Sequence, residues 1–458
     1  MDERTSFNRR EDIHIFTTVT NNPFFKQNRH IIKELFIKSI KAKHKKYSLF
    51  EIQFELLGHI IACEKIRKKY LKRKEWYAKT LVSLVEGKAD IERIKIAQQH
   101  IKDMNEYSTT AKWIIFCLRS IGDGIAWWFF DYDRPTLRLL SEHDYIPVQK
   151  LGVGLLKEIE EYIKQIEQGN IVLINSITNF LRVGDLTLYN LEEKKYKLIE
   201  VKSTIHNNQK IQRQTKHRNR IEKWFNTEIH DVFGPAMKKI SVNKPLLTHL
   251  KTLETVMIEA DKNLGSSCVY GDYIAFGVFS LTKLNKIDEV ESERKRTEII
   301  NRICSVVKKG DIALPVMTNI AASLHFSRGN APYSIFPLDL EKRFRLMIGE
   351  YLIMIILNIS GFKRWMNKRG WKTTFVNLPN EIPTESVPYI PMLQITQGIR
   401  TVELGLDMFT LASMELWMPE SLELEVNGII KATKNMTKQI SSAFYTCTYP
   451  NIGKYTWD

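Results

Sequence analysis

Three residues in the middle of the chain have the types and spacing that metal-assisted chemistry requires. Asp185 follows Gly184 in one β-rich stretch, and Glu200 and Lys202 stand two residues apart in the next. Because strand side chains alternate between faces, Glu200 and Lys202 are expected on one face and Val201 on the other. The separation of 15 positions from Asp185 to Glu200 suits two strands joined by a short turn, which would place the carboxylates side by side.

Two adjacent carboxylates are costly to bury unless a cation compensates their charge. Hard oxygen ligands favour Mg²⁺ or Mn²⁺, so Asp185 and Glu200 are predicted metal ligands, with the Val201 carbonyl as a third. The metal would polarise a phosphate oxygen and activate a water, while the Lys202 ammonium would orient that water or stabilise the transition state. The alternative is an exposed hairpin whose Glu200 and Lys202 pair in solvent.

The stretches RVGDLTLYN (182–190) and KLIEVKS (197–203) resemble the core of the PD-(D/E)xK superfamily of restriction-endonuclease-like nucleases. The resemblance covers roughly residues 150–280 and implies an αβββαβ core with metal-dependent phosphodiester cleavage. It implies catalytic roles for Asp185, Glu200 and Lys202. No proline precedes Asp185, which departs from the motif.

The resemblance also implies site residues on the two flanking helices. Family members often add an acidic residue from the helix before the strands, a place that Glu158 or Glu161 could fill. Some carry a glutamine or a basic residue on the following helix, where Arg213 and Gln214 stand. Of these candidates, Glu161 and Gln214 are predicted to be catalytic.

Two basic stretches are candidates for contact with a nucleic-acid backbone. Residues 208–226 are predicted to form a basic helix, which in the family flanks the active site. The predicted phosphate contacts on it are Lys210, Arg213, Lys216, Arg218 and Arg220. The second stretch is EKIRKKYLKRKE (64–75) in the N-terminal region. For both, the alternative is a solvated helix face.

Hydrophobic periodicity predicts the elements that must position these residues. The N-terminal part is expected to be helical, with Asp90 as an N-cap and an apolar stretch at 111–130 broken or turned at Gly122-Asp123-Gly124. A change of period then predicts a helix, three strands, a helix and a later strand, at 152–168, 171–176, 180–189, 196–203, 208–226 and 271–281.

The predicted fold class is mixed α and β (α+β), in three regions. A helical, basic N-terminal region (1–140) precedes a restriction-endonuclease-like αβββαβ core (141–285) and a mixed C-terminal region (286–458). Glu350 and Asn358 interrupt the apolar stretch 346–362, whose clean run is about half of the ~20 residues that a membrane span needs. This stretch is therefore predicted to be a buried helix.

Composition limits the classes of protein further. The chain has 458 residues, of which 43% are hydrophobic and 26% charged, as in a folded protein. Its net charge is +16, and residues 1–100 hold 22 Lys and Arg against 12 Asp and Glu, which favours a polyanionic partner. Five cysteines without a CxxC pair argue against thiolate zinc sites and disulfide scaffolds. The charged N-terminus lacks a signal-peptide core, so a cytoplasmic location is expected.

The leading expectation is a Mg²⁺- or Mn²⁺-dependent endonuclease that acts on nucleic acid, DNA rather than RNA, away from membranes. No GxxxxGK[ST] motif is present, which excludes a standard P-loop ATPase in this chain. Analogy favours antiphage defence, restriction or a mobile element in a prokaryote. The alternative is an inactive nucleic-acid-binding or assembly protein on the same fold. A homo-oligomer and an activating partner protein both remain open.

Overall fold

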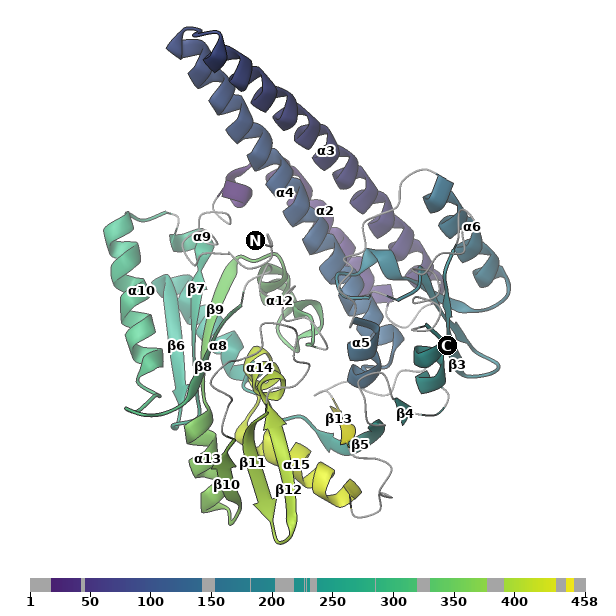
Figure 1. The fold of residues 1–458 in the computed structure, drawn as a ribbon, viewed down its shortest axis with the longest axis vertical. Helices are drawn as coiled ribbons and strands as arrows, with labels where there is room; N and C mark the ends of the chain where they lie inside the picture. Colours follow the sequence, from purple (N-terminus) through teal and green to yellow (C-terminus); the bar gives the residue numbers. More distant parts are fainter. Residues whose placement is uncertain are drawn as a thin grey trace.

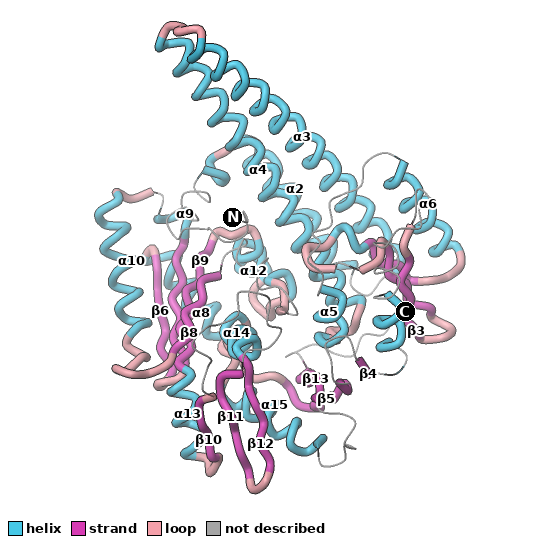
Figure 2. The backbone as a smooth tube through the Cα atoms, viewed as in Figure 1, coloured by secondary structure: helices cyan, strands magenta, loops and turns pink. Residues whose placement is uncertain are grey.

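The computed structural model combines long helices with small sheets (Figures 1 and 2). It describes residues 18–42, 46–141, 153–181, 183–201, 218–225, 227, 229–230, 237–284, 286–318, 330–376, 391–433 and 442–448. One contiguous cluster of buried apolar side chains draws on all three expected regions, from Val19 to Ile430. The mixed α and β class is confirmed.

Three helices form the N-terminal region: α2 (Pro23–Ala42), α3 (Lys46–Glu86) and α4 (Ile91–Phe129). The helices α3 and α4 lie side by side as a long hairpin whose far end projects beyond the rest of the molecule (Figure 1). As predicted, Asp90 is the N-cap of α4, and its side chain accepts a hydrogen bond from Glu92 N. Between Glu64 and Ser108 only Ala97 is buried, so we call residues 65–107 the arm.

The predicted break at Gly122-Asp123-Gly124 is wrong, because α4 continues through all three residues. These glycines instead permit close packing. A Cβ atom at Gly122 would lie 2.1 Å from the Ile177 carbonyl oxygen, and one at Gly124 would lie 2.7 Å from Ser334 Oγ. Asp123 accepts hydrogen bonds from Asn179 N at 2.7 Å and Asn179 Nδ2 at 2.8 Å.

After α5 (Arg134–Ser141), the order expected for the central core follows. Helix α6 (Val153–Glu167) precedes an antiparallel sheet in the order β1 (Ile171–Ile174), β2 (Leu186–Asn190), β3 (Lys195–Ile199). A short 3-10 helix, η1 (Asn175–Ile177), follows β1. Gln53 of α3 holds this sheet, since its Nε2 donates to Val172 O at 2.9 Å and its Oε1 accepts from Ile174 N at 2.9 Å.

The expected core is not established beyond this point. A helical segment at 218–225 follows β3, but the strand predicted at 271–281 belongs to another sheet. That strand is β7 (Ile274–Ser280), in a four-stranded antiparallel sheet with β6 (Gly265–Tyr270), β9 (Tyr351–Asn358) and β8 (Ala313–Thr318). β7 pairs with β9 along its whole length, which joins segments from either side of residue 285.

The prediction of a buried helix near 346–359 is wrong, because most of this stretch is strand β9. β9 lies between β7 and β8 and is buried almost throughout, so it needs no polar face. Helix α12 (Leu340–Met347) ends just before it, and Gly349 turns the chain with a φ of +83°. A short apolar run without alternation cannot distinguish a buried strand from a buried helix.

The remaining elements surround these sheets (Figure 1). Helices α8 (Leu250–Asn263), α9 (Leu281–Leu284), α10 (Glu289–Cys304) and α13 (Ile359–Lys368) flank the four-stranded sheet, and the 3-10 helix η2 (Tyr333–Ile335) packs against α4 and α12. An antiparallel sheet combines β10 (Lys372–Phe375), β11 (Pro391–Gln397) and β12 (Arg400–Gly405), followed by α14 (Leu406–Met414) and α15 (Pro419–Thr433). Strand β5 (Met237–Pro245) pairs with β4 (Ile229–His230) and, in parallel, with β13 (Ser442–Thr448). Within the described ranges, no helix combines the length and apolarity that crossing a membrane requires.

Candidate active site

The β2–β3 hairpin places Asp185 and Glu200 opposite each other, one residue beyond the ends of the two strands rather than inside them as predicted. The paired register ends with Leu186 opposite Ile199, so Asp185 and Glu200 are the next residues along the two chains. Gly184, with a φ of +73°, begins this end of the hairpin. The hairpin therefore brings Asp185 and Glu200 next to each other in space, as their separation in sequence predicted.

Hydrogen bonds hold Asp185 on three sides. Its carboxylate accepts from Val201 N at 2.8 Å, its amide donates to Ile199 O at 2.8 Å, and its carbonyl accepts from Asn175 N at 3.0 Å. The first of these bonds fixes the chain just past Glu200. Asp185 is thus positioned by both neighbouring strands.

Asn175 organises the loop before Asp185, and the sequence reasoning missed it. Its Nδ2 donates to Val183 O at 2.9 Å and Gly184 O at 3.3 Å, and its Oδ1 accepts from Thr187 Oγ1 at 2.9 Å. The side chain is almost wholly buried. The available signal was a polar residue that ends the apolar run IVLIN. An amide there satisfies carbonyl groups that a buried loop would otherwise leave without donors.

Helix α6 presents Glu158, rather than Glu161, to the strand ends. Glu158 is 2% exposed and accepts from Ser176 Oγ at 3.1 Å, next to Asn175. Glu161 instead accepts from Gln165 Nε2 at 2.7 Å and lies 3.5 Å from Lys164 Nζ, both on its own helix. Of the two alternatives, Glu158 is the one that contacts η1, through Ser176, the neighbour of Asn175.

The oxygen donors present fit a hard divalent cation. Asp185 and Glu200 are both partly buried, and Mg²⁺ commonly uses one or two carboxylates and completes its shell with water and phosphate. Val201 directly follows Glu200, and its amide donates to the Asp185 carboxylate. Across the described part of the chain, no group of three or more His, Cys, Asp or Glu side chains could hold a metal ion, so Glu158 does not complete a three-carboxylate site with Asp185 and Glu200.

Several predicted site residues lie outside the described residues: Lys202, Lys210, Arg213, Gln214 and Lys216. Arg218 and Arg220 lie in the helical segment 218–225 and are partly buried. This segment packs through Ile221 and Trp224, and Trp224 Nε1 donates to Thr136 Oγ1 at 2.8 Å. It therefore stands against α5, as a helix that follows β3.

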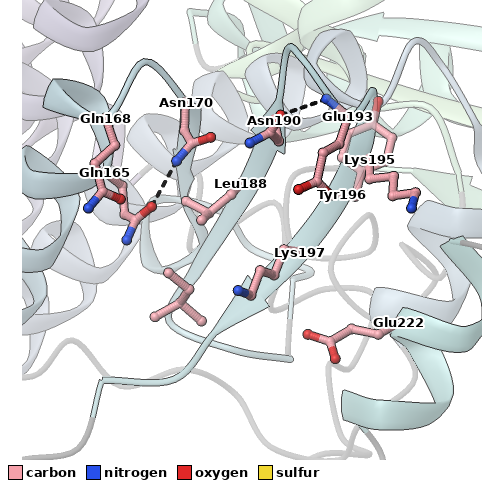
Figure 3. A pocket seen from close by; sticks show the side chains of 11 residues that line it. Gln165, Gln168, Asn170, Leu188, Asn190, Glu193, Lys195, Tyr196, Lys197 and Glu222 are labelled. Carbon is pink, nitrogen blue, oxygen red and sulfur yellow. Dashed lines mark hydrogen bonds between the residues drawn. The ribbon is translucent and has the colours of Figure 1, made fainter.

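A cavity of about 460 Å³ lies beside the same hairpin (Figure 3). Leu188 and Lys197 of the two strands line it, together with the end of α6 and Glu222 of the helical segment. Strand alternation assigns positions 186, 188, 197 and 199 to this face, and Asp185 and Glu200 to the other. The cavity is therefore distinct from the carboxylate pair.

Comparison with known proteins adds no relative to this geometry: no family model, no curated protein and no solved structure matches the chain.

Proposed function

We propose that this protein is a metal-dependent nuclease that hydrolyses phosphodiester bonds of nucleic acid, DNA in preference to RNA. The observation that carries the proposal is the register of the hairpin, which makes Asp185 and Glu200 neighbours at one end of a helix-flanked antiparallel sheet. The order α6, β1, β2, β3 and a following helix agrees with the family that the motif resembles.

In this proposal Asp185, Glu200 and the Val201 carbonyl hold Mg²⁺ or Mn²⁺. The bound metal supplies charge for the phosphate and an acidic water. Asp185 is pre-oriented by Val201 N, so its carboxylate loses little freedom when it binds a cation. Asn175 and Thr187 fix the backbone that carries Asp185. The role proposed for Lys202, which lies outside the described residues, is to supply an ammonium charge to the phosphate.

Cleavage assays with matched variants test the proposal. Supercoiled plasmid, linear duplex DNA and RNA are incubated with Mg²⁺ or Mn²⁺ and with wild type, Asp185→Asn, Glu200→Gln or Glu193→Gln. Glu193 lies in the exposed hairpin turn and serves as the control. We expect cleavage to fall at least ~100-fold in the first two variants, because even outer-shell partners of a metal contribute 10–100-fold. Chelation should abolish it.

Cleavage that survives Asp185→Asn and Glu200→Gln would overturn the assignment of the site. The second candidate function is an inactive nucleic-acid-binding or assembly protein, favoured by the structural use of the Asp185 carboxylate to cap Val201 N. It predicts no cleavage by any of the four proteins, intact binding, and a lower free energy of unfolding for Asp185→Asn alone.

A further inference from the structure

The outer face of the arm carries a continuous row of cations. Lys65, Lys68, Lys69, Lys72, Arg73 and Lys79 follow the i, i+3, i+4, i+7 spacing that places residues on one side of a helix. All six are exposed, and Trp76, which is 60% exposed, stands in the same row. We call these seven residues the arm stripe.

The opposite face of this part of α3 is used to hold the hairpin together. Tyr70 stacks on Tyr107 with centroids 4.8 Å apart, and Tyr77 stacks on His100 at 4.6 Å. Lys74 Nζ donates to Asn105 Oδ1 at 2.7 Å. The stripe therefore points away from α4 and has no part in closing the arm.

None of the six cations of the stripe forms an ion pair within the described residues. Helix α10 shows what a solvated charged helix looks like in the same molecule. There Arg294 pairs with Glu291 at 2.6 Å, Lys295 with Glu298 at 3.2 Å and Arg296 with Glu293 at 2.6 Å. A row of like charges without acidic partners repels itself and costs stability, which an external anion would offset.

We propose that the arm stripe binds the phosphate backbone of duplex DNA. From Lys65 to Lys79 the stripe spans about 21 Å at 1.5 Å per residue. A duplex of that length carries about twelve phosphate charges, so six cations on a rigid helix find anions along its whole length.

The residue types in the stripe favour a duplex over a single strand, and DNA over RNA. Single strands are held by stacking on several aromatic side chains, and the stripe has one, Trp76. Recognition of duplex RNA uses polar contacts to 2′-hydroxyl groups. No Ser, Thr, Asn or Gln occurs between Glu64 and Lys79, so the stripe offers charge and little else.

The stripe is rigidly connected to the candidate active site. The same helix holds β1 through Gln53, which lies about 18 Å along the axis before Lys65 at 1.5 Å per residue. The inference does not require catalysis, because a protein that cuts nothing would still bind DNA through the arm.

Binding is measured with a labelled 30-base-pair DNA duplex by fluorescence anisotropy, in chelator, between 50 and 200 mM salt. The test variant is Lys65→Gln/Lys69→Gln/Lys72→Gln, which keeps helix propensity. The control is Arg294→Gln/Lys295→Gln/Arg296→Gln on α10, which changes the net charge equally. Circular dichroism checks that both retain their helices.

We expect the arm variant to bind at least tenfold more weakly, with a log–log salt slope shallower by roughly three, since each lost phosphate contact removes about one. The α10 variant should bind as wild type does. Equal weakening of both variants would mean that bulk charge drives binding, and an unaffected arm variant would place the contact elsewhere; either result overturns the proposal. Stripe-dependent binding to duplex RNA as tight as to DNA, or to anionic vesicles in its place, also overturns it.

Discussion

At the scale of single residues, His249 has an environment that stands out. It is the N-cap residue of α8, it is 5% exposed, and its ring stacks on Tyr270 with centroids 3.8 Å apart. Neither ring nitrogen has a hydrogen-bond partner among the described residues. Burial of the ring lowers the pKa of His249 to about 4, because the imidazolium form would be desolvated without compensation.

This burial predicts a pH-dependent loss of stability. As the pH falls from 6.5 to 4, the unfolded chain takes up the His249 proton before the folded protein does, so wild type is destabilised in that window. We expect His249→Phe, which keeps a ring against Tyr270, to remove about 3 kcal/mol of this loss. Urea unfolding of both proteins at pH 7.5 and pH 4 measures the difference. Equal losses in the two proteins would contradict the prediction.

The carboxylate pair shows how far single residues could be predicted from the sequence. Asp185 and Glu200 could be matched because strand alternation and the length of the turn fix their relation locally. Glu158 could be named only as one of two alternatives and Asn175 not at all, since each acts through a contact with a segment about ten or more residues away that only the folded chain brings together.

At the scale of elements, glycines in helices test whether packing or propensity decides stability. Gly122→Ala would put a Cβ atom 2.1 Å from the Ile177 carbonyl oxygen, where η1 crosses α4. We expect it to lower the free energy of unfolding by about 1–3 kcal/mol or more, although alanine is the better helix former. The control is Gly58→Ala in α3, where nothing lies within 4 Å, and it should stabilise the protein by about 0.5–1 kcal/mol.

Chemical denaturation of the two glycine variants distinguishes these effects. If Gly122→Ala were as stable as wild type, the close approach of α4 and η1 would not constrain the fold. The same contact explains why glycines occur at 122 and 124 within a continuous helix, although the sequence indicated a turn there. Glycine signals a break locally, and here it serves an approach by Ile177 and Ser334 that no local pattern records.

Strands set by local sequence could be predicted, whereas strands set by contacts with distant segments could not. β2 and β3 were predictable because they are joined by a short turn and carry charge beyond their apolar positions. The sequence of β9 resembles a buried helix because β7 and β8 pair with its two edges while α10, α12 and α14 pack against it, so it has no solvated face and its sequence does not alternate. For the same reason the pairing of β7 with β9 could not be anticipated.

At the scale of the whole molecule, ion pairs connect the N-terminal helices to the C-terminal half. Glu350, before β9, accepts from Arg29 Nη2 of α2 at 2.8 Å and from Arg345 Nε of α12 at 2.7 Å. Arg345 also donates to Asp261 of α8 at 2.7 Å. Against the effect of burial, hydrogen bonds from Arg345, Lys342 and Tyr351 hold the pKa of Asp261 far below its usual value. Ion pairs thus hold α2 against α12, in addition to the apolar core that they share.

Among the described residues, the pair between Arg134 and Glu415 is the most deeply buried connection of this kind. Arg134 of α5 donates two hydrogen bonds to Glu415, at 2.9 and 2.8 Å, and lies over the rings of Trp127 and Trp417. Glu415 is wholly buried and also accepts from Trp417 Nε1 at 3.0 Å and Ala331 N at 2.7 Å. Loss of its cation would leave a buried charge.

We therefore expect Arg134→Met to destabilise the protein by about 3–5 kcal/mol, and Arg134→Met/Glu415→Gln to be more stable than that single variant. The two other hydrogen bonds end on different oxygens of Glu415, so the glutamine carbonyl keeps one of them and leaves no buried charge to compensate. The control is Arg369→Met, because Arg369 pairs with Glu423 at 2.9 Å but is 51% exposed, and its loss should cost at most about 1 kcal/mol. Denaturation followed by tryptophan fluorescence measures wild type, Arg134→Met, Glu415→Gln, the double variant and Arg369→Met. A double variant as unstable as the sum of its single variants would show that charge burial is not what couples these two halves, whereas recovery would show that it is.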